Sequence, residues 1–239
     1  KYEDPEYSIT QTPLNEQDLK TMSEAVEVLR QFKGFSYFTE MSDIINRLED
    51  HVASARMKTT PVIDFEKNES LKGLDHLDTI YHAIVNEHPI QLKYRSFKAR
   101  SANSFIFYPY LLKEYRNRWF VYGVRGNGRI LQNLALDRIQ SLEVLPQQHY
   151  IKNTFFDPNT FFDDLVGVTK NSGSVAEKVG FKVAAAEAPY IITKPIHRSQ
   201  QVVERLADGS VILEIEVVIN HELERVFFGY AEGIQVLYP

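Results

Sequence analysis

Basic and aromatic side chains alternate through one stretch of the chain, and they are the residues best suited to binding an anion. Between Gln91 and Arg138 there are ten Lys or Arg residues and two acids, so this stretch carries +8 and the other 191 residues carry −13. Arginine suits phosphate because its planar guanidinium donates two parallel hydrogen bonds. Nucleobases can stack on the aromatic rings in between. The pattern predicts a local anion site, with a solvated basic face over core aromatics as the alternative.

The positions of several residues in this stretch make them candidates for ligand contact. Lys93 and Arg95 share one face of an alternating segment, and Tyr94 stands between them in the sequence. Arg118 and Arg129 each flank a tight turn. Asp137 precedes Arg138, and an acid in this position can also fix a structural arginine.

The residues that usually build catalytic or metal sites are not arranged for that chemistry here. His221–Arg225 begins like a zinc-protease helix, but Arg225 stands where the second histidine ligand is needed. His76, His82 and His88 are spaced by six, so successive members point about 240° apart on a helix. The chain has no cysteine. We therefore expect neither an enzyme nor a bound metal or cofactor, unless a carboxylate and a histidine converge in a deep pocket.

The first 73 residues predict a helical connector. Asn15 is suited to cap one amphipathic helix that ends near Gly34, and Met41–Val52 predicts a second. The segment from Ala53 to Ser70 has the composition of a linker. Two amphipathic helices cannot bury both apolar stripes alone, so they must pack on a neighbouring domain or a second subunit.

The middle of the chain changes from a helical to a strand period. A third helix is predicted over Leu77–Ile84, because Pro89 cannot continue it, and alternation at Ile90–Tyr94 predicts a strand. Four further strands are predicted at Phe105–Leu112, Trp119–Val124, Ile130–Leu134 and Arg138–Leu145. Five short, closely connected strands indicate a small barrel.

The C-terminal third predicts strands and helices in the order βαββαβ, the ferredoxin-like pattern. After a short helix at Pro158–Leu165, the strands are predicted at Phe181–Ala185, Gln201–Leu206, Val211–Ile219 and Ile234–Leu237, and the helices at Pro189–Lys194 and Glu222–Ala231. Asn220 is suited to cap the last helix. The fold class is therefore α+β. No apolar run could span a membrane, and the absence of cysteine fits a reducing compartment, so we expect a cytoplasmic protein.

Four separated segments, in order, resemble the WYL-domain family of regulators. Trp119–Val121, which follows Arg118, matches the family's namesake tripeptide, with Phe for Tyr and Val for Leu, and Leu134–Ile139 matches the run into the last barrel strand. Tyr94 and Pro109–Leu111 match two earlier strands. The segments Lys194–Gln200 and Gly229–Pro239 resemble the C-terminal extension that follows many WYL domains, so the resemblance covers Leu77 to Pro239.

The resemblance implies an SH3-like (Sm-like) five-stranded barrel followed by a ferredoxin-like extension. It further implies a homodimeric bacterial transcription regulator whose barrel binds an effector, in some members nucleic acid. Many members have a basic residue where Gln132 stands and an arginine where Ala135 stands, so this chain departs from the family at both positions.

Together these observations predict three parts: a connector and dimerisation segment (1–73), a WYL domain (74–150) and a ferredoxin-like extension (151–239). A DNA-binding winged helix-turn-helix head is expected to be missing from this chain, which begins without Met. The WYL domain would sense single-stranded nucleic acid or a nucleotide, and the alternative is an interaction or architectural module with no ligand. The predicted ligand contacts are Lys93, Tyr94, Arg95, Arg118, Trp119, Arg129, Asp137 and Arg138.

Overall fold

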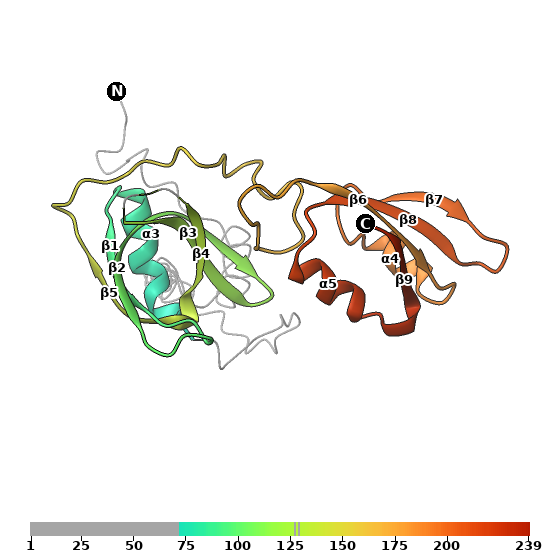
Figure 1. Cartoon of the computed structure of the whole chain (residues 1–239), viewed down its shortest axis with the longest axis horizontal. Helices are drawn as coiled ribbons and strands as arrows, with labels where there is room; N and C mark the ends of the chain where they lie inside the picture. The colour runs from blue at the N-terminus through green and yellow to red at the C-terminus, as the bar shows by residue number, and fades with distance from the viewer. Residues whose placement is uncertain (1–71, 127, 129) are drawn as a thin grey trace, which may run out of the picture. The chain divides into compact units, whose positions relative to one another are not determined.

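A computed structural model describes residues 72–126, 128 and 130–239 (Figure 1). The two connector helices predicted before residue 72, and the predicted contact Arg129, lie outside these residues. The first described elements are the 3-10 helix η2 (Leu74–His76) and helix α3 (Leu77–Val85). Both sheets of the described residues lie in one compact unit, Thr79–Pro239.

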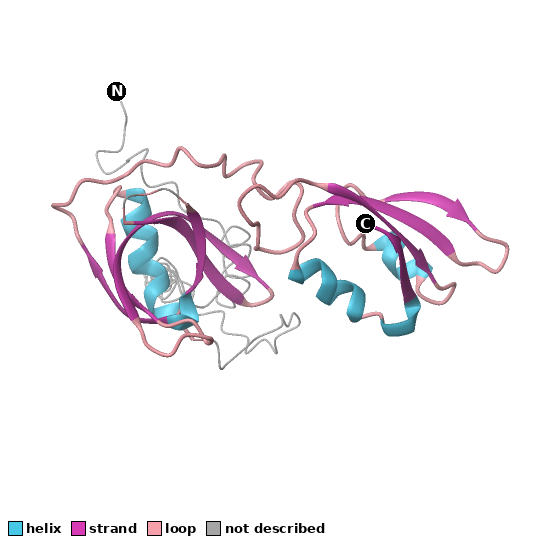
Figure 2. Ribbon diagram, viewed as in Figure 1, coloured by secondary structure: helices cyan, strands magenta, loops and turns pink. Residues whose placement is uncertain are grey.

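The first sheet has five antiparallel strands in the order β4-β3-β2-β1-β5. Its strands are β1 (Ile90–Tyr94), β2 (Asn103–Tyr115), β3 (Arg118–Arg125), β4 (Leu131–Ala135) and β5 (Ile139–Val144), with the 3-10 helix η3 (Leu136–Arg138) between the last two. Figure 2 shows that this sheet is strongly curved. The residues that alternate along its strands bury one face, including Ile90, Leu92, Phe107 and Val121 with no exposed surface.

Two local features shape β2 and β3. Arg116 (φ 49°) and Asn117 (φ 59°) form a two-residue hairpin turn in which both central residues have positive φ, the geometry that matches the twist of the strands. Further along β3, Gly123 lies against β2 so closely that a Cβ atom would be 2.1 Å from the Tyr108 carbonyl oxygen. The register shifts nearby, between Pro109 and Leu111, so the long strand β2 bends at this point.

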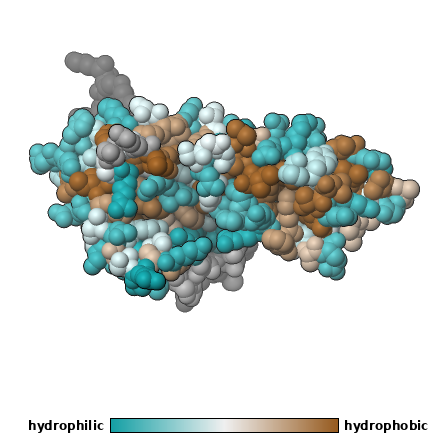
Figure 3. Space-filling view, in the orientation of Figure 1, coloured by the Kyte–Doolittle hydropathy of each residue, from teal (hydrophilic) through white to brown (hydrophobic). Residues whose placement is uncertain are grey.

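The second sheet has four antiparallel strands in the order β7-β8-β6-β9. Its elements follow one another as β6 (Glu177–Val183), α4 (Ala188–Thr193), β7 (Gln201–Arg205), β8 (Val211–Val217), α5 (His221–Phe228), the 3-10 helix η4 (Ala231–Gly233) and β9 (Ile234–Tyr238). Phe181, Leu213 and Ile215 form its core with Ile191 of α4 and Leu223 of α5. Apolar side chains such as Val203 and Val236 stay exposed on the edge strands, and Figure 3 shows apolar residues on this part of the surface.

The prediction of a mixed α+β protein is confirmed, with two antiparallel sheets. Asn220 caps α5 as predicted, since its side chain accepts a hydrogen bond from the Leu223 amide. The helix predicted at Pro158–Leu165 is wrong: the segment forms successive turns. The backbone bonds from Asp163 to Thr160 and from Leu165 to Phe162 reach three residues back, and the single bond of helical span, from Phe161 to Asp157, is not continued into a helix. Within the described residues, no helix is long and apolar enough to cross a membrane.

The physical reason for the turns is aromatic packing. The rings of Phe161 and Phe162 both contact Tyr122, with centroids 5.7 and 5.4 Å away. Consecutive residues of a helix point about 100° apart, so a regular helix presents adjacent rings to one partner poorly. Other predicted elements shift at their ends: β6 begins four residues early at Glu177, and Arg138 lies in η3 instead of beginning β5.

Candidate anion-binding site

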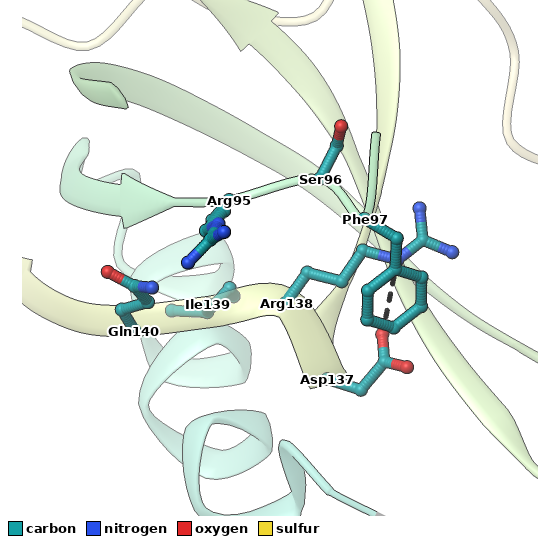
Figure 4. Close-up of a pocket in the computed structure, with 7 residues that line it drawn as sticks. All are labelled: Arg95, Ser96, Phe97, Asp137, Arg138, Ile139 and Gln140. Carbon is teal, nitrogen blue, oxygen red and sulfur yellow. Dashed lines mark ion pairs between the residues drawn. The ribbon is translucent and has the colours of Figure 1, made fainter. Parts of the chain in front are cut away.

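The end of β1 and the turn η3 lie side by side. The Arg95 amide donates to the Arg138 carbonyl over 3.1 Å, which continues the β1–β5 pairing past the last residue of β1. A pocket of about 300 Å³ opens between the two segments. Figure 4 shows the residues that line it: Arg95, Ser96, Phe97, Asp137, Arg138, Ile139 and Gln140. The pocket thus draws on two stretches that are forty residues apart in the sequence.

One carboxylate, that of Asp137, forms ion pairs with two arginines at this site. Asp137 lies 3.2 Å from Nε of Arg118 (Oδ2) and 3.7 Å from Nε of Arg138 (Oδ1), and its side chain is 10% exposed. Neither Asp137 Oδ1 nor Arg138 Nε has a hydrogen-bond partner within the described residues, although both atoms are buried. One negative charge therefore faces two positive ones.

Phe97 covers the guanidinium of Arg138. The central carbon of the guanidinium lies 4.6 Å from the ring centroid, which is cation–π contact. Figure 4 shows the ring beside the guanidinium and in front of the ion pair between Arg138 and Asp137. The Phe97 side chain is nevertheless 74% exposed. A large aromatic ring that is fixed on one side and open to solvent on the other can stack with a planar ligand group.

Arg95 and Tyr94 complete the surroundings. Arg95 is exposed, and no ion pair joins it to a carboxylate of the described residues. Burial raises the pKa of the Tyr94 phenol, while the positive charge of Arg138 and a hydrogen bond with the Ala135 backbone oppose the rise. The phenol of Tyr94 therefore stays protonated at neutral pH and can act as a hydrogen-bond donor beside Arg138.

The predicted contacts divide into three groups. Arg95, Asp137 and Arg138 line the pocket, and Tyr94 and Arg118 adjoin it through Arg138 and Asp137. The remaining two described contacts lie elsewhere along the strands: Lys93 is exposed on β1 opposite Ser104 and Ser141, and Trp119 is half-buried on β3 opposite Glu114. Neither lines the pocket.

The predicted contact residues leave out four of the lining residues: Ser96, Phe97, Ile139 and Gln140. Phe97 carried a usable signal, because it is an aromatic residue between Arg95 and Lys98 in the basic stretch. The backbone pairing that brings residues 95–97 to η3 could not be predicted from a comparable pattern in the sequence.

The two positions where the family pattern differs also lie outside the pocket. Gln132 is half-buried on β4 opposite Gly123, and Ala135 is buried opposite Phe120. Other arginines of the basic stretch pack on different rings, such as Arg125 on Phe105 at 4.0 Å. Within the described residues there is no group of three or more His, Asp or Glu side chains that could hold a metal ion.

Comparison with known proteins finds two matching domain families. The WYL domain model matches residues 75–144, which contain the first sheet and the pocket, and the WCX domain model matches residues 176–239, which contain the second sheet. No curated protein matches the chain significantly.

Among solved structures, the chain resembles proteasome accessory factor B/C (PafBC) of Arthrobacter aurescens at 16% identity with a TM-score of 0.36. The likeness covers 80% of this chain and 28% of that one, so the chain spans little more than a quarter of its relative. The two domain models together match more than half of the 239 residues, in the same order as the two sheets. The chain therefore belongs to the WYL-domain family, with a WYL domain followed by a WCX domain.

Proposed function

We propose that the WYL domain of this chain binds an anionic ligand, a nucleotide or single-stranded nucleic acid, in the pocket between β1 and η3. The chain would act as the effector-sensing and dimerisation region of a bacterial transcription regulator that contacts operator DNA through a separate head. The observation that carries the proposal is the arrangement of charge: Arg138 lies between Phe97 and Asp137, while Arg95 has no acidic partner among the described residues.

The pocket suits an anion with a planar group. Arg95, Arg118 and Arg138 supply three positive charges against the single charge of Asp137. A phosphate can take hydrogen bonds from the exposed guanidinium of Arg95, and a base can stack on the open face of Phe97. An uncharged or cationic ligand would leave this excess of positive charge uncompensated.

We further propose binding rather than catalysis. Within its described lining the pocket has one carboxylate and no histidine, and Asp137 is held in ion pairs with Arg118 and Arg138. A carboxylate whose two oxygens face guanidinium groups is poorly placed to take a proton from a ligand.

We also propose a fold type for each of the two sheets. The curved sheet β4-β3-β2-β1-β5, with η3 before its last strand, fits an SH3-like barrel. The second sheet places the first and third strands of a βαββαβ unit at its centre, which fits a ferredoxin-like domain. We keep the predicted boundaries, 1–73, 74–150 and 151–239, as part of this proposal.

Fluorescence anisotropy with short labelled single-stranded oligonucleotides and with a labelled nucleotide tests the binding. Arg138→Ala should weaken binding at least tenfold, because a hydrogen bond to a charged group contributes about 1.5–3 kcal/mol. Arg205→Ala is the matched control, since Arg205 is an exposed arginine of the second sheet. Equal binding by wild type and Arg138→Ala, or no binding of any of these anions, would exclude the proposal and favour an architectural module.

A further inference from the structure

A short buried segment between the two domains contacts both of them. Leu165–Thr169, the clasp segment hereafter, connects the aromatic turn region with the loop before β6. Leu165, Val166 and Val168 are buried, and Val166 belongs to the core of the second sheet. A loop of ordinary linker character would instead be exposed and variable in conformation.

On the WYL side, the clasp segment is held through one carbonyl group. The Val168 carbonyl accepts hydrogen bonds from the Tyr122 hydroxyl of β3 and from Nδ2 of Asn133 of β4, the latter over 2.6 Å. Tyr122 and Asn133 are directly opposite in the β3–β4 pairing. Burial raises the pKa of Tyr122 far above its usual value, so its hydroxyl remains a donor at any ordinary pH.

On the WCX side, the same segment is held by the N-terminal end of α5. Nδ2 of Asn220 donates to the carbonyls of Val166 and Thr169, each over 2.9 Å, while its Oδ1 caps the helix at Leu223. The Thr169 hydroxyl also donates to the Glu222 carboxylate over 2.7 Å. The Asn220 side chain thus uses its acceptor for the helix and both of its donor hydrogens for the clasp segment.

Gly167 is required for this fit. Its φ of +90° is rarely adopted by other residues, and an added Cβ would lie 2.5 Å from Cγ of Glu222. Gly173, in the same linker, has a similar φ of +80° but nothing within 4 Å of an added Cβ. A substitution at Gly173 therefore tests backbone strain alone, whereas one at Gly167 tests backbone strain together with the contact with α5.

We infer that the clasp segment couples the WYL sheet mechanically to the N-terminal end of α5, so that a change at β3 or β4 alters the stability of the WCX domain. Both domains donate hydrogen bonds to carbonyl groups of the clasp segment. Because the segment is so short, breaking the bonds to one domain also displaces the carbonyl groups that are bonded to the other. The inference does not depend on a ligand.

Hydrogen exchange of the whole ligand-free chain, followed by mass spectrometry, tests the coupling from the WYL side. Tyr122→Phe removes one donor to Val168, and exchange in residues 218–228 should become about three- to tenfold faster, the loss expected for one hydrogen bond. Tyr150→Phe is the matched control, because the Tyr150 hydroxyl also donates to a backbone carbonyl of the first sheet, that of Pro109. Unchanged exchange at 218–228 in Tyr122→Phe, or an equal change in Tyr150→Phe, would overturn the coupling.

A second pair of variants tests the clasp segment itself. Gly167→Ala should speed exchange in both β3–β4 and α5, whereas Gly173→Ala should affect only its own turn. If Gly167→Ala does not fold, Thr169→Val removes the hydroxyl bond to Glu222 with little change of shape and should speed exchange on both sides to a smaller extent. Effects of Gly167→Ala or Thr169→Val that stop at residues 164–170 would contradict the inference.

Discussion

Asp137 sets the charge of the pocket, since it is the one carboxylate between two arginines. Its position next to Arg138 in the sequence suggested an ion pair, but the closer partner is Arg118, nineteen residues earlier. The pairing of β3 with β4, in which Phe120 lies opposite Ala135, and the turn η3 that follows bring Arg118 and Asp137 together. A neighbour in sequence is therefore a poor guide to which arginine an acid neutralises.

Replacing Asp137 with Asn should strengthen anion binding and weaken the fold. The lost charge leaves Arg118 and Arg138 free for a ligand, and affinity for a single-stranded oligonucleotide should rise roughly fivefold, as expected for removing a like charge a few ångströms away. The free energy of unfolding should fall by about 1–2 kcal/mol. Asp163→Asn, which removes the ion pair with Arg198 outside the pocket, should leave the affinity unchanged. Weaker oligonucleotide binding by Asp137→Asn would show that Asp137 serves the ligand directly.

His197 should make the protein less stable in mild acid. It is buried, and its Nδ1 accepts a hydrogen bond from the Ser199 amide, which requires that atom to be unprotonated. Burial is the main reason that the pKa of His197 falls below 6.5, and the charge of Arg198 adds to it, while Asp163 and Asp164 oppose.

The unfolded chain protonates His197 more readily than the folded chain does. The stability that neutral His197 contributes is therefore present above pH 6.5 and is lost as the pH falls below it. Urea unfolding at pH 7.5 and 5.5 measures the loss, and His197→Asn should reduce it. His149→Gln, at an exposed position, should leave the pH dependence as in wild type. An identical pH dependence in His197→Asn and wild type would rule out this role.

At the level of elements, the sequence predicted what depends on local pattern. Alternation along β1 and the cap at Asn220 both depend on nearby residues, and both are observed. The helix predicted at Pro158–Leu165 failed because contacts of Phe161 and Phe162 with Tyr122, about forty residues away, decide the backbone there. Phe97 joined the site for the same kind of reason, through pairing with η3. A local window of sequence does not predict packing between residues that lie far apart in the chain.

The β2–β3 hairpin has a turn that its sequence satisfies only in part. Arg116 holds φ at 49°, a conformation that costs most side chains about 1–2 kcal/mol but suits Asn. Arg116→Asn should therefore raise the free energy of unfolding by about 0.5–1 kcal/mol, measured by urea unfolding. Arg116→Ala removes the same charge without the preference for this turn and should give no gain. Equal effects of the two substitutions would mean that charge, not backbone conformation, is responsible.

Over the whole molecule, positive charge concentrates in the WYL domain of a chain with net charge −5. The structure divides that charge: Arg95 and Arg138 line the pocket and Arg118 adjoins it through Asp137, while Arg125 packs on Phe105 elsewhere in the domain. The number of phosphates held should follow the three pocket arginines and not the ten basic residues of the stretch.

Salt dependence measures that number. If two or three phosphates are neutralised, the logarithm of the association constant for a single strand should fall against the logarithm of salt concentration with a slope of about −1.4 to −2.1. Arg138→Ala should make the slope shallower by about 0.7, and Arg205→Ala should not change it. A slope several times steeper would indicate that the whole basic stretch binds the strand.

An amide nitrogen–proton NMR titration of the chain with a short single-stranded oligonucleotide tests the central claim most directly. Binding in the pocket should shift the amide resonances of Arg95, Ser96 and Phe97 together with those of Leu136–Gln140, at lower oligonucleotide concentrations than any others. Shifts confined to the second sheet, or a spectrum unchanged at saturating oligonucleotide, would contradict the claim that these arginines form the ligand site.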